Sequence, residues 1–160
     1  MIRKTLIVSL VVAASAFAAP PVLERAPQLP SNFTMQCEEG STWAGQYGLK
    51  HGFIGCVDAQ GQMQGKTFYI YADGSIQDIG LMDHGNRTGV WKHFDRQGNK
   101  IGETTFVNDR FEGKRVTFHA NGQIRTIDNW NQGALVGVRQ YFDMNGNPAT
   151  SFATADTTTK

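Results

Sequence analysis

The sequence predicts an all-β protein, an elongated single-layer antiparallel sheet built from successive β-hairpin repeats. The first observation is a gapless alignment of four segments at a 24-residue period. Their leading glycines are Gly65, Gly89, Gly113 and Gly137, and their closing glycines are Gly74, Gly98, Gly122 and Gly146. Such a period is typical of repeat proteins, in which each unit buries its apolar side chains against its neighbours. The second observation is that turn-forming residues recur too often for amphipathic helices, which indicates short strands joined by tight turns.

Each unit is predicted to contain two strands and two turns. The first strand follows the leading glycine, and the first turns lie at residues 73–74, 97–98, 121–122 and 145–146. The Asn-Gly and Asp-Gly pairs among them accept the positive φ of a tight turn at low cost. The second strands are expected at residues 75–82, 99–107 and 123–130, and the second turns at residues 83–86, 108–110 and 131–133.

Side chains alternate between the two faces of a strand, so the phase within the repeat predicts which residues share a face. The residues expected on a packing face are Ile70, Phe94, Phe118 and Phe142, with Phe68, Val90, Val116 and Val138. Large apolar residues also recur in the second strands, at Met82, Phe106 and Trp130. The opposite face of the first strands is expected to carry Tyr69, Tyr71, Trp91, His93, Asp95, Arg115, Thr117, His119, Arg139, Tyr141 and Asp143.

The N-terminal residues 1–18 are typical of an export signal peptide. Arg3 and Lys4 precede an apolar run at residues 6–14, and Ala16 and Ala18 provide small residues for cleavage near Ala18. The alternative is a membrane anchor, but the run is shorter than the roughly 20 residues that a span requires. We therefore expect a periplasmic or secreted protein with no stable membrane span after cleavage.

Composition and charge give the expected organisation of the mature chain. Residues 19–36 are predicted to be a Pro-rich linker, residues 37–64 an N-terminal cap, residues 65–153 the hairpin repeats and residues 154–160 a disordered tail. Removing Arg3 and Lys4 changes the formal net charge from +1 to −1. A nearly neutral chain argues against nucleic acid as a partner, because that binding depends on a basic surface.

The two cysteines, Cys37 and Cys56, are expected to form a disulfide. An even number of cysteines in an exported chain favours this pairing, which would stabilise the fold by about 3 kcal/mol in the chain-entropy model. The alternative is a metal or redox pair, although the spacing is far from Cys-x-x-Cys. The bridge would hold the cap, whose residues 52–61 resemble a degenerate unit outside the 24-residue register.

Catalytic motifs are absent from the sequence: it contains no nucleophile elbow, phosphate-binding loop or His-Glu-x-x-His motif. The alternative of a small metal-dependent hydrolase rests on His93 and His119, which have matching parity in adjacent units and lie near Asp95 and Asp143. We expect a non-enzymatic protein without a cofactor.

The units resemble the MORN-type repeat, in the variant form common in exported and antitoxin-like bacterial proteins. Residues 89–98 match its Gly-x-Trp-x-x-aromatic-x-x-Asn-Gly pattern best, whereas the other units have Thr67, Arg115 or Arg139 at the Trp position. The resemblance covers about residues 52–152. It implies an elongated sheet of hairpins that serves as an interaction or scaffolding module.

We expect the mixed face to bind a protein partner in the cell envelope, because aromatic residues and Arg are enriched in recognition sites. The candidate binding residues are Tyr69, Tyr71, Trp91, His93, Arg115, His119, Arg139 and Tyr141. One alternative is a glycan or peptidoglycan ligand stacked on the aromatic rings, and another is that the face only packs within the fold. The resemblance adds an immunity or antitoxin role. The C-terminal edge of the sheet offers strand pairing with a partner or a second copy, and hence a homo-oligomer.

Overall fold

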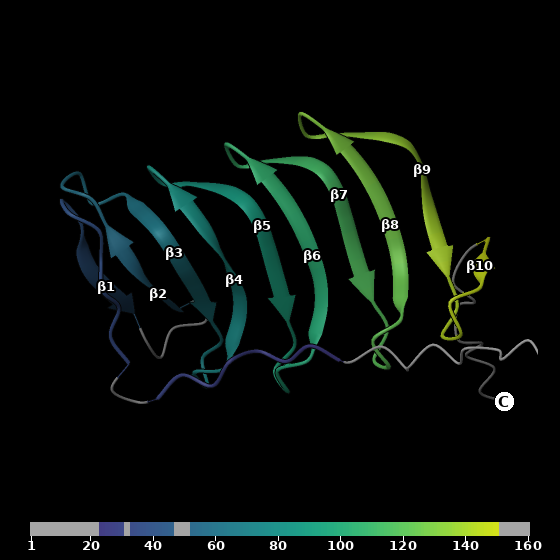
Figure 1. The fold of residues 1–160 in the computed structure, drawn as a ribbon, viewed down its shortest axis with the longest axis horizontal. Coiled ribbons are helices and arrows are strands. Elements are labelled where there is room, and N and C mark those ends of the chain that lie inside the picture. The colour runs from purple at the N-terminus through teal and green to yellow at the C-terminus, as the bar shows by residue number, and fades with distance from the viewer. Residues whose placement is uncertain (1–22, 31–32, 47–51, 151–160) are drawn as a thin grey trace, which may run out of the picture.

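The computed structural model describes residues 23–30, 33–46 and 52–150, which form a single open antiparallel sheet of ten strands in chain order (Figure 1). The strands are β1 (Thr42–Gln46), β2 (Gly52–Val57), β3 (Met63–Ile70), β4 (Ile76–Asp83), β5 (Asn86–Phe94), β6 (Lys100–Val107), β7 (Arg110–Phe118), β8 (Ile124–Asn131), β9 (Ala134–Phe142) and β10 (Pro148–Ala149). The predicted all-β hairpin fold is confirmed. The expected signal peptide and C-terminal tail lie outside the described residues.

The turns at the lower ends of the hairpins in Figure 1 repeat one hydrogen-bond pattern. In the turn between β5 and β6, the Asp95 amide donates to the Asn99 carbonyl (3.0 Å) and the Gly98 amide donates to the Asp95 carbonyl (2.9 Å). The Asp95 carboxylate also accepts from the Asn99 amide at 2.8 Å. The closing Gly98 has φ +80°, a conformation that glycine adopts without strain. The closing glycine recurs in each of these turns, and Asp95 and Asp143 add the carboxylate contact in two of them.

The second set of turns has two central residues, both with positive φ. The values are His84 44° and Gly85 81°, Asn108 48° and Asp109 63°, and Gln132 47° and Gly133 84°. This geometry matches the twist of the flanking strands in a two-residue hairpin. The predicted positions of these turns are confirmed.

Strands β5, β7 and β9 each bend (Figure 1), and each contains a leading glycine with positive φ. Gly89 has φ +66°, and the pairing of β4 with β5 shifts between Ile79 and Leu81 beside it. A shift of this kind increases local twist and bends the strand. The bend repeats at Gly113 and Gly137, so the periodic glycines give the sheet its regular curvature.

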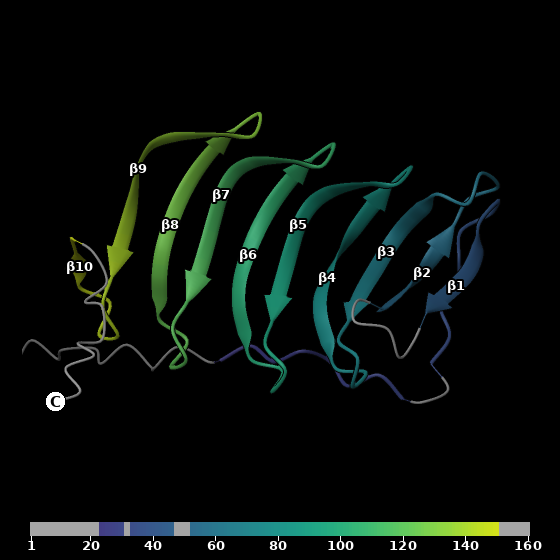
Figure 2. The ribbon, with the colours of Figure 1, turned by 180° about the vertical axis from the view of Figure 1, so that it is seen from behind.

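One face of the sheet, the arm face, is covered in part by residues 23–30 and 33–41, which we call the arm. Four arm side chains pack against the buried cluster of the sheet: Ala26, Leu29, Phe33 and Met35. That cluster contains Ile54, Phe68, Ile70, Ile76 and Phe94. The arm runs past the lower ends of β4, β5 and β6 in both views (Figure 1 and Figure 2). The stretch expected to be a linker is therefore, where described, part of the packed core.

Ion pairs and the disulfide fix the arm at both ends. Glu24 accepts hydrogen bonds from Lys92 (2.5 Å) and Lys100 (2.6 Å). These bonds, led by the one from Lys100, lower the pKa of Glu24 below its usual value. The predicted bond between Cys37 and Cys56 is present and joins the arm to β2.

The other face, the aromatic face, has its own buried cluster of Met82, Trp91 and Phe106. Trp91, expected on an exposed binding surface, is only 1% exposed. In contrast, Val90 (53% exposed) and Val138 (85% exposed) were expected in the packing face. The expectations for the two valines were wrong because a single-layer sheet buries side chains only where something covers them, whereas Trp91 is buried by its packing with Met82 and Phe106 on its own face. The described arm reaches β6, and Val90 and Val138 lie beyond its cover.

Within the part of the chain that the structure describes, no helix has the length and apolar character needed to cross a membrane.

Candidate binding face

Strand pairing arranges the aromatic face in rows that run across the sheet. One row contains Tyr69, Asp78, His93, Gly102, Thr117, Thr126 and Tyr141. The predicted binding residues Tyr69, His93 and Tyr141 therefore lie on one face and in one row, although they come from strands β3, β5 and β9.

The next row contains the Trp position of the repeat and shows a regular packing rule. Its members are Thr67, Gly80, Trp91, Thr104, Arg115, Asp128 and Arg139. Trp91 lies over Gly80, eleven residues earlier, so closely that a Cβ on this glycine would be 2.2 Å from the indole. The Trp91 Nε1 donates to the Leu81 carbonyl at 3.1 Å. Trp91 thus fits this position because the preceding strand has no side chain there.

Arg139 also has its partner eleven residues earlier, but this partner is a carboxylate, that of Asp128. Its Nε and Nη2 donate to the two carboxylate oxygens of Asp128 at 2.6 and 2.8 Å. Asp128 is 2% exposed, and these hydrogen bonds raise the pKa of Arg139 above its usual value. A bidentate pair of this kind is among the stronger polar contacts in proteins.

Of the two arginines in the row, Arg115 is the one whose preceding-strand neighbour is neutral. That neighbour is Thr104, which lies directly opposite it in the pairing of β6 with β7. The Arg115 Nη1 is 4.0 Å from the carboxylate of Asp128, both oxygens of which already accept from Arg139. The guanidinium lies over the ring of Phe111, 5.7 Å from its centroid.

His93 is held in a defined orientation beside Arg115. Its Nδ1 is 2.6 Å from the Asp78 carboxylate, and its Nε2 is 2.9 Å from the Thr104 hydroxyl. The two contacts use both ring nitrogens. The histidine therefore connects the two rows and fixes the hydroxyl that faces Arg115.

Aromatic rings form a continuous series along this face. Successive centroids are 5.5 Å apart for Tyr69 and Trp91, 6.4 Å for Trp91 and Phe106, 5.1 Å for Phe106 and Phe111, and 4.9 Å for Phe111 and Trp130. Arg87 covers Phe106 at 4.1 Å and donates from Nε to Asp109 at 2.7 Å. Ring faces that carry other rings and guanidinium groups are closed to further stacking.

A pocket of about 340 Å³ opens on this face between β4 and β7. The residues that give it polar and aromatic character are Asp78, Arg87, His93, Phe106, Phe111 and Arg115. Gly102 also lines it, between His93 and Thr117 in the first row, and the His93 ring lies close to this glycine, where a Cβ would be 3.5 Å from Cδ2 of the ring.

The remaining predicted binding residues lie at the ends of the strands. The Tyr71 hydroxyl donates to the Phe94 carbonyl at 3.0 Å, and burial raises the pKa of this tyrosine. His119 Nε2 lies 2.8 Å from the Phe142 carbonyl. Both side chains link neighbouring units along the sheet.

The two histidines of the hydrolase alternative are not brought together. His119 follows the end of β7, one row position beyond Thr117, which is the residue in register with His93 through Gly102. Asp95 and Asp143 hold turn amides. Over the described ranges, no group of three or more His, Cys, Asp or Glu side chains is arranged to hold a metal ion.

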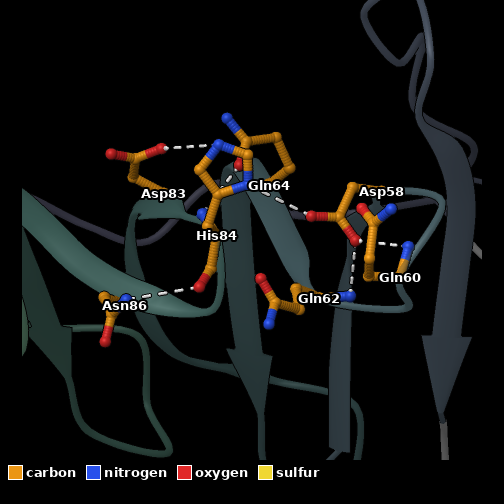
Figure 3. Close-up of polar contacts among 7 residues, drawn as sticks. All are labelled: Asp58, Gln60, Gln62, Gln64, Asp83, His84 and Asn86. Atoms are coloured by element: carbon orange, nitrogen blue, oxygen red, sulfur yellow. Dashed lines mark hydrogen bonds and ion pairs between the residues drawn. The ribbon is translucent and has the colours of Figure 1, made fainter.

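His84 belongs to a separate cluster of turn residues (Figure 3). It stands between two carboxylates, with Nδ1 3.2 Å from Asp58 and Nε2 3.8 Å from Asp83. Asp58 also accepts from the amides of Gln60 and Gln62, and the bond from Gln62 is the main cause of its lowered pKa. The cluster ties the turn after β2 to the turn after β4.

The sequence interpretation missed Gly80, Asp128, Arg87 and Gly102 as determinants of the site. A detectable pattern was present for the first two. Aligned at 24 residues, Gly80 and Asp128 are the second-strand residues eleven positions before Trp91 and Arg139. Reading both columns together would have shown which partner each large side chain has.

Comparison with known protein families identifies the repeats. Residues 87–108 and 111–132 each match the profile of the MORN repeat variant. The chain carries MORN-variant repeats. The two matched segments correspond to the hairpins β5–β6 and β7–β8, so the MORN unit is the hairpin that presents Trp91 or Arg115. MORN repeats are typically binding or scaffolding modules and generally non-catalytic. A comparison with curated proteins gives no match.

Proposed function

We propose that this MORN-repeat protein is an exported binding module whose aromatic face contacts a protein partner in the cell envelope. The observation that carries the proposal is the pocket of about 340 Å³ between β4 and β7, which is lined by Arg, His and aromatic side chains. The arm packs on the opposite face and leaves this one open. Arg and aromatic residues around a pocket are typical of the anchor points of protein interfaces.

A protein ligand fits this face better than a glycan. Binding of sugars to aromatic residues uses an exposed ring face, whereas Trp91 is buried over Gly80 and Phe106 is covered by Arg87. What the pocket offers is hydrogen-bond donors beside apolar walls. Pairing of the C-terminal edge with a second copy stays a separate prediction, and among the described residues β10 pairs with β9 at Phe142 and Tyr141.

The test is site-specific photo-crosslinking in the living host. A photoreactive residue is placed at Ile101, which lines the pocket, or at Val90, which is exposed on the arm face. The two sites lie on adjacent strands but on opposite faces of the sheet, so the comparison reports which face contacts the partner. We expect a discrete protein adduct from Ile101 and none from Val90. Adducts from Val90 alone, or from neither site, would contradict the proposal.

A further inference from the structure

We propose that the pocket binds a carboxylate of the partner, the side chain of an Asp or Glu, through the guanidinium of Arg115. This inference rests on the proposed function and names the chemistry of its anchor. The ligand carboxylate would bind Arg115 as the Asp128 carboxylate binds Arg139.

The large side chains in the row that contains Trp91, Arg115 and Arg139 each lie against a residue of the preceding strand. Each large side chain in this row is matched by a residue eleven positions earlier: Trp91 by Gly80, and Arg139 by Asp128. Arg115 is matched by Thr104, which has no charge. Since Arg139 occupies both oxygens of Asp128, the 4.0 Å approach of Arg115 to that carboxylate leaves most of its five donors available.

The charged side chains around the pocket also favour an anionic ligand. The ionisable residues lining the pocket are Arg87, Arg115, His93 and Asp78, together with Tyr71, whose raised pKa keeps it neutral at neutral pH. Asp78 lies 2.6 Å from His93 and is directed to that ring. Arg87 binds Asp109 through Nε. The two guanidinium groups therefore favour an anion, and the apolar walls of Phe106 and Phe111 reduce the screening of that attraction by water.

The shape of the Arg115 guanidinium suits a carboxylate. A guanidinium presents parallel N–H groups that match the two oxygens of a carboxylate, and the Arg139–Asp128 pair shows this geometry one unit away, at 2.6 and 2.8 Å. The pocket of about 340 Å³ is lined by Arg115, so a side-chain carboxylate that enters it can reach this guanidinium.

The experiment measures binding of a fluorescein-labelled peptide, Gly-Glu-Phe-Glu-Gly, to the intact disulfide-bonded protein by fluorescence anisotropy. The matched peptide has Gln in place of both Glu residues. We expect saturable binding of the Glu peptide and binding of the Gln peptide weaker by about tenfold or more, the range for a charge-assisted bidentate contact. No saturation by the Glu peptide, or equal binding of both peptides, overturns the inference.

Two variants assign the contact to Arg115. Arg115→Gln should weaken binding of the Glu peptide by about tenfold or more, whereas Lys114→Gln should change it by less than about twofold. Lys114 is the adjacent exposed residue of β7 on the arm face, so its variant removes the same charge from the wrong side. Thr104→Asp should also weaken binding, because it supplies Arg115 with an internal carboxylate as Asp128 does for Arg139. Unchanged binding in both Arg115→Gln and Thr104→Asp overturns the inference.

Two further readouts separate the explanations. In a ¹H–¹⁵N spectrum, the Glu peptide should shift the Nε–Hε resonance of Arg115 and leave that of Arg139 in place; inorganic phosphate producing the same shift at equal concentration would show general anion binding and overturn carboxylate recognition. Crosslinking from Ile101 in the Arg115→Gln background distinguishes the two proposals. If that adduct persists and the Glu peptide also fails to saturate on the wild-type protein, the carboxylate inference fails and the protein-binding function stands.

Discussion

Trp91 and Arg115 occupy equivalent positions of adjacent units, yet Trp91 is buried and Arg115 reaches a pocket. The difference comes from the preceding strand, where Gly80 leaves space for an indole and Thr104 does not. Alternation along the strand predicted correctly that these side chains share a face, since this is a property of the extended backbone. It could not predict burial, which depends on the residue across the sheet and on the cover above it.

A double-mutant cycle tests the match between Gly80 and Trp91. Gly80→Thr should destabilise the protein by about 1–3 kcal/mol, because the added atoms would overlap the indole. Combining it with Trp91→Arg copies the Thr104–Arg115 pair, and the double variant should lose less stability than the sum of the two single variants. The stability of the wild type and of each variant is measured by urea unfolding. Far-UV circular dichroism follows the transition, because this signal does not depend on Trp91. If the losses of stability were additive, the side chains at positions 80 and 91 would have no interaction energy.

The Arg139–Asp128 pair gives a second prediction at this scale. Arg139→Gln leaves a buried carboxylate without its bidentate partner, and we expect a loss of about 1–3 kcal/mol, less than for a fully buried pair because the Arg139 side chain is 40% exposed. The control is the double variant Asp128→Asn with Arg139→Gln, in which no charge is buried. Chemical denaturation should find the double variant more stable than Arg139→Gln. The reverse order would show that the remaining carboxylate costs little.

At the scale of elements, the arm is where the sequence interpretation differed most from the structure. Its prolines indicated an extended segment, and residues 23–30 are extended, but spacing alone could not show that Leu29 and Phe33 pack on the sheet. An extended segment that packs across a sheet face leaves no periodic pattern in the sequence. The hairpins behave differently, because their turns are specified locally by Asp, Asn and Gly.

The ion pairs of Glu24 predict an acid-sensitive arm. The folded-state pKa of Glu24 is lowered, first by the hydrogen bond from Lys100 and then by that from Lys92. A group with a depressed folded pKa stabilises the native state above its unfolded pKa and loses this contribution as the pH falls through the folded pKa. The wild type should therefore melt at a higher temperature than Glu24→Gln near neutral pH.

The difference between these two melting temperatures should shrink as the pH falls below the usual pKa of 4.5 and disappear below the lowered folded-state pKa of Glu24. Carboxylates of the turns, such as Asp95 and Asp143, also have lowered pKa values, but they titrate equally in both proteins and cancel in the comparison. Differential scanning calorimetry across this range provides the measurement. A difference that is constant with pH would assign the effect to packing of the Glu24 side chain rather than to its charge.

At the scale of the whole molecule, the 24-residue register predicted the sheet because each unit needs its neighbours to bury its side chains. The strand order, the hairpin turns and the disulfide follow from features that can be read in the chain. The binding face required more: rows across the sheet depend on the pairing shifts beside the leading glycines. Those shifts decide which residues of different units meet.

The modular register makes a final prediction about deletions. Removing residues 113–136 takes out 24 residues and joins Glu112 to Gly137, which keeps the leading glycine and the phase of every later side chain. It removes Asp128 together with the unit, so Arg139 would then face Thr104 in the place of Arg115 and no buried carboxylate would be left unpaired. We expect a folded monomer with similar circular dichroism per residue and a lower unfolding midpoint, because one interface between units is lost.

The matched control removes one residue more, residues 113–137. This deletion takes away the glycine at the bend and reverses the face of each side chain that follows, so Gln140 would take the position of Arg139 on the aromatic face and Arg139 would move to the arm face. Light scattering and circular dichroism should then show aggregation or loss of structure in the 25-residue deletion but not in the 24-residue deletion. If both variants folded equally well, the sheet would be held together by strand pairing without regard to face, and the rows that form the pocket would have no role in specifying the fold.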